Sequence, residues 1–201
     1  STPKPTVSVP TTASETQALP PIAPATTANS SIDATPVSIA TFKPYLTSML
    51  QAAHDRNRSG IDQSVNALAG LPRPPAGNKV AARSANEQGL DALKSQSYAS
   101  AIAAFRLGIE QDPSNVELIN NLGFALYKNG QLNPAKDQIE LSLLYSPKRA
   151  SAWVNLGDIY FKEGNEANAI DAYLLAYAFT SNKDRLYKSV ESQAENDPDS
   201  Y

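Results

Sequence analysis

The chain has 201 residues, with 17 Lys and Arg against 20 Asp and Glu, 15 prolines, one histidine and no cysteine. The missing cysteines exclude disulfides, thiolate zinc sites and cysteine nucleophiles, and a lone histidine excludes a histidine-rich metal cage. The formal charge of −3 lacks the basic excess typical of nucleic-acid-binding proteins, and no run of about 18 apolar residues is present to span a membrane. We therefore expect no metal, no cofactor, no nucleic-acid partner and no membrane span in this chain.

Residues 1–40 are rich in small residues and proline. Ser, Thr, Pro and Ala occupy 28 of these 40 positions, and none of the 40 is aromatic. Fixing 40 backbones costs on the order of 40–80 kcal/mol. Burying the few larger aliphatic side chains there returns at most about 20 kcal/mol. The sequence therefore predicts a disordered tether, partly in polyproline II conformation.

A helical pattern begins at Thr41. Its apolar residues recur at helical spacing: Phe42, Tyr45, Leu46, Met49, Leu50 and Ala53. A second, shorter apolar stripe over 61–68 ends at Gly70, before the proline-rich segment 71–75. Two such short helices are marginal alone in water, so 41–79 is expected to be a helix pair with a proline-rich linker that docks on another part of the domain. The only histidine, in the first of these helices, has no catalytic partner pattern and is expected to be a surface or packing residue.

Residues 80–195 repeat at an offset of 34. Small and bulky side chains recur at this offset: Gly89, Gly123 and Gly157; Ala101, Ala135 and Ala169; Phe105, Ile139 and Tyr173; Pro113 and Pro147. Small residues are expected where two helices approach closely, bulky ones where each pair fills the space between neighbours, and proline where a unit ends. The offset therefore predicts stacked helix pairs.

The third unit carries Trp153, Leu156, Gly157 and Tyr160, then Ala169 and Tyr173. This pattern resembles the tetratricopeptide repeat (TPR) signature. The resemblance implies an all-α fold, a right-handed superhelix of three helix pairs at 82–115, 116–149 and 150–183 whose first helices line a concave groove. A capping helix over 184–195 and an acidic tail over 196–201 would follow.

The resemblance implies no reaction. Family members mostly hold peptides, extended segments or helices of other proteins in the groove, so we expect a protein or peptide partner. By the family's geometry, positions 2, 5, 6, 9, 12 and 13 of each repeat face this groove. The residues expected to contact the partner are Asn86, Leu90, Lys94, Asn120, Asn121, Phe124, Tyr127, Lys128, Asn155, Asp158, Phe161 and Lys162.

Three features stand out among these positions. Asn121 and Asn155 are 34 apart, and their carboxamides are expected either to hold the main chain of a peptide or to bond a neighbouring helix. An aromatic patch, Phe124 with Tyr127 and Phe161, is expected to grip apolar side chains, unless these rings are part of the core. Lys94, Lys128 and Lys162, again 34 apart, either attract an acidic partner or complement the negative ends of their helices.

TPR modules that resemble chaperone adaptors clamp a C-terminal carboxylate with Lys, Asn, Asn, Lys and Arg at five set positions. Those positions hold Asn86, Leu90, Asn121, Ser151 and Asn155 here. Only the third of them fits, and the cations that would neutralise a carboxylate are absent from the set. A heat-shock chaperone cofactor is therefore not expected.

A Ser/Thr/Pro/Ala-rich tether ahead of a cysteine-free helical domain resembles bacterial envelope proteins, where such linkers follow a signal anchor or lipid-modified residue. We expect a periplasmic or membrane-tethered protein with a possible upstream membrane anchor, and the alternative is a cytoplasmic fragment of a longer chain. The predicted function is a non-enzymatic module that binds an extended peptide or helix as part of an envelope assembly. The alternative is a self-associating assembly subunit whose groove is filled by its own 41–70 helices.

Overall fold

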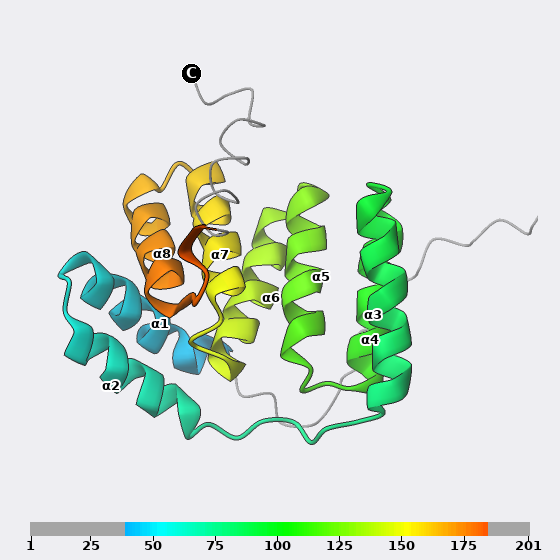
Figure 1. Ribbon diagram of the computed structural model, residues 1–201, viewed down its shortest axis with the longest axis horizontal. Helices are drawn as coiled ribbons and strands as arrows, with labels where there is room; N and C mark the ends of the chain where they lie inside the picture. The colour runs from blue at the N-terminus through cyan, green and yellow to red at the C-terminus, as the bar shows by residue number, and fades with distance from the viewer. Residues whose placement is uncertain (1–38, 185–201) are drawn as a thin grey trace, which may run out of the picture. The chain divides into compact units, whose positions relative to one another are not determined.

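The computed structural model describes residues 39–184 (Figure 1). This part of the chain forms eight helices: α1 (Ile39–His54), α2 (Arg58–Ala69), α3 (Lys79–Lys94), α4 (Tyr98–Gln111), α5 (Val116–Lys128), α6 (Leu132–Tyr145), α7 (Ala150–Lys162) and α8 (Glu166–Phe179). With no strand between residues 39 and 184, the all-α fold class is confirmed. None of these eight helices is both long and apolar enough to cross a membrane.

Some of the predicted segments lie outside the described residues. These are the tether up to residue 38 and, beyond residue 184, the expected cap and acidic tail. Helix α1 begins at Ile39, so residues 39 and 40, which we assigned to the tether, form its first turn.

Each expected repeat corresponds to one helix pair: α3 with α4, α5 with α6, and α7 with α8. Helix α3 begins at Lys79, before the expected start of the first repeat at residue 82. The second helix of one pair packs on the first helix of the next, through α4 with α5 and α6 with α7. The repeats therefore stack in chain order, as the offset of 34 predicts.

Within each pair, a glycine of the first helix faces a bulky side chain of the second. A Cβ atom added at Gly123 would lie 2.5 Å from Cδ1 of Ile139, and one at Gly157 would lie 2.5 Å from Cε1 of Tyr173. In the first pair, a Cβ at Gly89 would collide with the Phe105 ring. These distances are shorter than van der Waals contact, so the recurring glycines permit the close approach that the sequence predicts.

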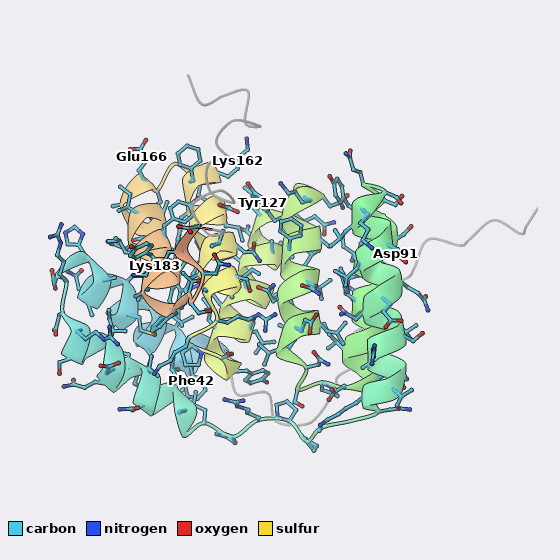
Figure 2. The ribbon with its side chains drawn as sticks, in the orientation of Figure 1. Phe42, Asp91, Tyr127, Lys162, Glu166 and Lys183 are labelled. Atoms are coloured by element: carbon cyan, nitrogen blue, oxygen red, sulfur yellow. The ribbon has the colours of Figure 1, made fainter. Side chains whose placement is uncertain are left out.

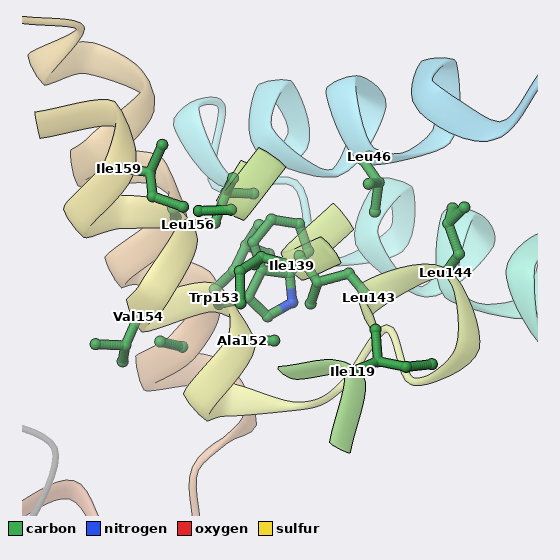
Figure 3. Close-up of a cluster of buried hydrophobic side chains, with 14 of the residues drawn as sticks. Leu46, Ile119, Ile139, Leu143, Leu144, Ala152, Trp153, Val154, Leu156 and Ile159 are labelled. Carbon is green, nitrogen blue, oxygen red and sulfur yellow. The ribbon is translucent and has the colours of Figure 1, made fainter. Parts of the chain in front are cut away.

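The centre of the core is Trp153, which is completely buried (Figure 3). Its indole Nε1 donates a hydrogen bond of 2.8 Å to the carbonyl oxygen of Pro147, so the polar atom of this large side chain is satisfied. Figure 3 shows Leu46 of α1 pointing toward the cluster that contains Trp153, Ile139 and Leu143. Helix α1 is therefore part of the core of the repeat domain.

The α1–α2 pair packs mainly through α1 against α6 and α8, the second helices of repeats 2 and 3. The expectation that the two short helices dock on the domain is confirmed. The alternative that they fill the groove is wrong, because the groove-lining helices would be α3, α5 and α7. We call the surface of α6 and α8 under α1 the outer face.

The linker that joins α2 to α3 is fixed at its end. The backbone N–H of Gly77 donates to Oδ1 of Asp112 at 2.9 Å, and that of Asn78 donates to the carbonyl of Gln111 at 2.7 Å. A Cβ atom at Gly77 would collide with the same carbonyl oxygen. The hairpin is thus tied to repeat 1 at one end of the linker and to repeats 2 and 3 through α1.

Candidate functional site

The residues predicted to contact a partner belong to α3, α5 and α7. We call the surface that these positions are predicted to form the inner face. Two asparagine pairs connect these helices across it. Asn121 donates from Nδ2 to Oδ1 of Asn86 at 2.9 Å, joining α5 to α3. Asn155 donates from Nδ2 to Oδ1 of Asn120 at 3.1 Å, joining α7 to α5. These asparagines therefore bond a neighbouring helix, which was the second of our two expectations.

The pairing follows a rule that the sequence contained but that we did not use. Asn86 and Asn120 both occupy position 5 of their repeats, and Asn121 and Asn155 both occupy position 6. Each pair joins position 5 of one repeat to position 6 of the next, so its partners are 35 residues apart, not 34. Stacking places these two positions side by side on successive first helices.

The exposure of the asparagines decides what they can still contact. Asn120 and Asn155 are only 5% and 8% exposed, so a partner's main chain has little access to them. Asn86 and Asn121 are half-buried, and Nδ2 of Asn86 also donates to Oε1 of Glu117 at 3.2 Å. Of the two asparagine pairs, Asn86–Asn121 is therefore the one that presents amide groups at the inner face, and we exclude Asn155 from the proposed contact surface.

Asp158, another expected contact, is also buried. Its Oδ1 accepts a hydrogen bond of 2.8 Å from the hydroxyl of Tyr173 on α8. Burial raises the pKa of the Tyr173 hydroxyl well above its ordinary value, and the Asp158 carboxylate raises it further. Tyr173 therefore stays a neutral donor at physiological pH, and Asp158 links the two helices of repeat 3.

The aromatic patch remains partly open. Phe124 and Tyr127 are half-buried, and Phe161 is 47% exposed. The Lys128 ammonium lies 5.5 Å from the ring centroid of Phe124 and 5.4 Å from that of Tyr127. These are cation–π distances, so the two rings orient the lysine at the edge of the patch. Leu90, the corresponding position in repeat 1, is half-buried against the core.

The three lysines at position 13 differ in their surroundings. Lys94 lies 2.8 Å from Asp91, one turn earlier in the same helix. Lys128 and Lys162 line an open cavity of about 340 Å³ together with Tyr127, Gly130 and Leu132. Figure 2 shows Tyr127 and Lys162 at the same end of the helices. Gly130 lies in the turn after α5, and Leu132 is the first residue of α6. No sequence pattern marked either residue as part of a site.

On the outer face, Lys43 and His54 of α1 lie beside buried carboxylates of α6 and α8. Nζ of Lys43 lies 3.4 Å from Oε2 of Glu140 on α6, and Nδ1 of His54 lies 3.5 Å from Oδ2 of Asp171 on α8. The carboxylate side chains are 3% and 8% exposed. Burial raises the pKa of both carboxyl groups, and the Lys43 and His54 partners offset part of the rise. His54 is thus a surface residue with a structural partner.

Comparisons with known proteins address the origin of the repeats. Residues 122–184 match the family model of the tetratricopeptide repeat. The matched segment runs from within α5 to just beyond α8, so this part of the chain is similar to that family. A curated TPR protein of Mycosarcoma maydis, "Small glutamine-rich tetratricopeptide repeat-containing protein 2", is 26% identical over 108 residues, which are 54% of this chain and 31% of that protein. The chain thus spans about a third of the length of this relative.

Solved TPR domains share the fold. The Sgt2 TPR domain of Aspergillus fumigatus superposes with a TM-score of 0.53 at 24% identity, covering 62% of this chain and 83% of that domain. The first TPR of Spaghetti (RPAP3), bound to the HSP90 peptide SRMEEVD, gives 0.53 at 18% identity, covering 61% and 97%. At these identities the likeness concerns the fold of the TPR domain and not its ligand.

Proposed function

We propose that this chain is a non-enzymatic interaction module that binds an extended peptide or helix of a protein partner on the inner face. The observation that carries this proposal is the partly open aromatic patch of Phe124, Tyr127 and Phe161. Within residues 39–184, the chain's own extra helix pair packs on the outer face and not on this patch. The TPR fold is generally a peptide-binding scaffold, which supports the assignment.

The half-exposed Asn86–Asn121 pair supplies polar contacts beside the patch. Its carboxamides are already aligned by their mutual bond, so they lose little freedom when a peptide main chain approaches. The remaining asparagines and Asp158 hold the first helices and repeat 3 in place. In this arrangement apolar side chains of the partner supply most of the binding energy, and the amides set the direction of the chain.

The partner is proposed to differ from a chaperone C-terminus. RPAP3 binds the HSP90 peptide, but the clamp positions of this chain hold Asn86, Leu90, Ser151 and Asn155 where that function needs other residues. We expect SRMEEVD to bind at least tenfold more weakly to this chain than peptides selected on it. Isothermal titration measures the difference.

The proposal is tested by selecting binders from a phage-displayed library of random 12-residue peptides on the full chain. Phe161→Ala should weaken the selected peptides about five- to thirtyfold, which corresponds to about 1–2 kcal/mol for a contact at the centre of an interface. Leu107→Ala is the matched control, because Leu107 is 50% exposed on α4, away from the inner face. Equal losses in both variants, or no selectable peptide, would contradict the proposal.

A second candidate is self-association through the exposed side chains of α8, the last helix that the structure describes. Ile170, Leu174 and Tyr177 form an apolar stripe on α8 and are each 45–59% exposed. The residue equivalent to Ile170 in repeat 2 is Lys136, which contacts the next first helix by lying 4.4 Å from the Tyr160 ring centroid. Light scattering on the wild type and on Leu174→Glu tests this candidate. Association through α8 requires that the wild type has a mass above that of the monomer and that the variant has the mass of the monomer.

The tethered envelope setting is part of our proposal and is supported by the composition of residues 1–40 alone. A chain that works at the end of such a tether should retain partner binding when residues 1–38 are removed. Fractionation of the source cells with an antibody against the repeats tests the location. Recovery of the native protein in the cytoplasmic fraction would contradict an envelope setting.

A further inference from the structure

The linker between α2 and α3 contains a proline pattern that the proposed function does not use. Residues 71–75 read Leu-Pro-Arg-Pro-Pro, so Pro72 and Pro75 stand three residues apart. Each of these five residues either is a proline or precedes one. Proline fixes φ at about −65°, and its ring pushes the residue before it toward an extended backbone. The sequence therefore favours a polyproline II conformation here, with about three residues per turn.

The burial of the linker follows the same period. Leu71 and Pro74 are half-buried, and Leu71 packs against the hydrophobic core. Pro72 and Pro75, each one residue further along, are exposed, and so is Arg73. Residues three apart share one edge of a polyproline II helix. One edge of the linker therefore packs on the domain, while the edge that carries the two exposed prolines faces solvent.

Both ends of this segment are fixed. The Leu71 N–H donates to the Leu68 carbonyl at 3.2 Å. At the other end, the N–H groups of Gly77 and Asn78 donate to repeat 1. Figure 1 shows the segment between these ends as an extended connection from α2 to α3. In the part of the chain that the structure describes, the backbone of 72–76 makes no hydrogen bond, so its carbonyl groups are available to a partner. An extended ligand that is already ordered loses little further freedom on binding.

Arg73 adds a charge to the exposed side of the linker. It takes part in none of the ion pairs found between the described residues. Burial raises the pKa of the nearby Tyr145 hydroxyl, and the Arg73 charge offsets part of the rise. Tyr145 stays neutral at physiological pH, and a neutral hydroxyl does not cancel the guanidinium charge. A carboxylate of a partner can therefore pair with Arg73 in charge-assisted hydrogen bonds.

We propose that residues 71–76 form a second interaction surface, which binds the aromatic-lined groove of a polyproline-binding domain. Grooves of this kind, as in SH3 and WW domains, recognise proline-rich P-x-x-P segments in the polyproline II conformation. Pro72 and Pro75 supply that spacing on an exposed edge, and Arg73 pairs with an acidic residue beside the groove. The linker lies outside α3, α5 and α7, so this surface is separate from the inner face and does not depend on the proposed function.

The test uses the full chain and a panel of purified SH3, WW and EVH1 domains that bind P-x-x-P peptides. These grooves recognise proline spacing and main-chain conformation, so domains of any source report whether the segment is a ligand. We expect at least one domain to bind the immobilised chain with a dissociation constant below about 100 µM. The double variant Pro72→Ala/Pro75→Ala should weaken this binding about tenfold or more, because it removes both rings from the exposed edge.

Pro44→Ala is the matched control, because Pro44 is also exposed but lies inside α1. This variant should bind the domain as the wild type does. Arg73→Gln should weaken binding about two- to fivefold, the range for partly solvated charge pairs. Circular dichroism of the linker variants should match the wild type, because Pro72, Arg73 and Pro75 are exposed and lie outside the helices.

The outcomes decide between a ligand and a rigid spacer. If no domain binds below about 100 µM, or if the double proline variant binds as well as the wild type, the inference is overturned and the segment is a spacer. Equal losses for Pro44→Ala and the double variant overturn it as well. An unchanged affinity for Arg73→Gln overturns the acidic contact. Phe161→Ala should weaken inner-face peptides but leave domain binding unchanged, so failure of one surface is distinguishable from failure of the other.

Discussion

The α1–α2 hairpin and the three repeat hairpins have the same turn but pack on different surfaces. In all four, the second residue after the end of the first helix has a positive φ: 52° at Arg56, 56° at Gln96, 77° at Gly130 and 75° at Gly164. The next N–H in each bonds to the carbonyl five residues earlier, as in Asn57 to Ala52 at 2.7 Å and Asn165 to Tyr160 at 2.8 Å. The α1–α2 pair is therefore built locally like a repeat, as a Schellman-type turn between two helices.

The interior of the hairpin differs from that of a repeat. Aligned on the shared turn, Met49 stands where the repeats have glycine, and Val65 stands where they have Phe, Ile or Tyr. Met49 is fully buried and Val65 nearly so. The small and the large residue have exchanged helices, which fills a similar volume but changes the surface that the hairpin offers to its neighbours.

The same alignment explains why α1 packs on the outer face. The six positions of α1 that correspond to the inner-face positions are Lys43, Leu46, Thr47, Leu50, Ala53 and His54, and they include the residues that join α1 to the outer face. Leu46 and Leu50 are buried there, whereas the corresponding Asn86 and Leu90 of repeat 1 stay half-exposed. Hairpin geometry thus does not decide where a hairpin packs. The polarity of one helix face decides it.

The largest expected effect on stability comes from a substitution in the contact between α1 and the repeats. Leu46→Ala should lower the free energy of unfolding by about 2–5 kcal/mol, because it leaves a cavity in the buried contact between α1 and the repeats. Tyr45→Ala, which changes the exposed neighbour, should cost less than about 1 kcal/mol. Urea denaturation gives both values. If Leu46→Ala were as mild as its neighbour, α1 would not be part of the core.

A repeat hairpin should be most sensitive at its glycine. Gly157→Ala should cost about 1–3 kcal/mol, because the new methyl group forces the Tyr173 ring to move. Gly70→Ala is the control, since the nearest atom to an added Cβ there is the Ala67 carbonyl oxygen at 3.8 Å, an ordinary contact. Thermal unfolding followed by circular dichroism separates the two. Equal melting temperatures would show that the helices of repeat 3 are not closely packed.

The loss of stability on substituting an asparagine should be larger for the buried pair than for the half-exposed pair. Asn120→Ala removes the acceptor of the buried Asn155 amide and should cost about 1–3 kcal/mol. Asn86→Ala acts on the half-exposed pair, where water can replace the lost acceptor, and should cost about 1 kcal/mol or less. Chemical denaturation of the two variants tests the ranking. The reverse ranking would contradict the assigned burial.

The outer face predicts a pH dependence. The pKa values of Glu140 and Asp171 are raised in the folded state by burial, so the folded chain binds more protons than the unfolded chain between the unfolded and folded pKa values. Their contribution to stability is therefore largest at low pH and is lost as the pH rises through the folded pKa. Glu140→Gln should flatten the change in stability between pH 4 and pH 7, and Lys43→Met should steepen it. A steeper profile for Glu140→Gln would contradict the sign.

The smallest effect concerns the shared turn. Gln96→Gly should stabilise the chain by about 0.5–1 kcal/mol, since glycine adopts a positive φ without steric cost. Gly130→Ala should destabilise it by a similar amount. Differential scanning calorimetry resolves both as opposite shifts in Tm. Shifts of the same sign would show that the two turns do not share a conformation.

Much of the fold could be predicted from the sequence, because small and bulky residues recur at a fixed offset. Glycine opposite a bulky residue at an offset of 34, together with Trp153 in the third unit, locates the helix pairs without any structure. The surface on which α1–α2 packs could not be predicted, since its contacts, such as Lys43 with Glu140 and His54 with Asp171, join residues about 100 positions apart in the chain. The periodicity of apolar residues within a helix or a repeat does not predict such a contact.

The candidate site was predicted less completely. Position numbers identified Phe124, Tyr127 and Phe161, which remain the proposed contact patch. They did not foresee that Asn155 and Asp158 are buried, because burial depends on how closely neighbouring elements approach. The cavity between repeats 2 and 3 also arises only on stacking, where Leu132 and Gly130 meet the two lysines.

The central claim is that one face of the repeats is kept for a partner while the other is covered by the chain's own hairpin. Nuclear magnetic resonance of the ¹⁵N-labelled full chain, titrated with a library-selected peptide, tests it most directly. The account predicts chemical-shift changes centred on Phe124, Tyr127 and Phe161, with the amides of α1 and α2 unchanged. Changes centred on α1, or on the outer face of α6 and α8, would contradict it.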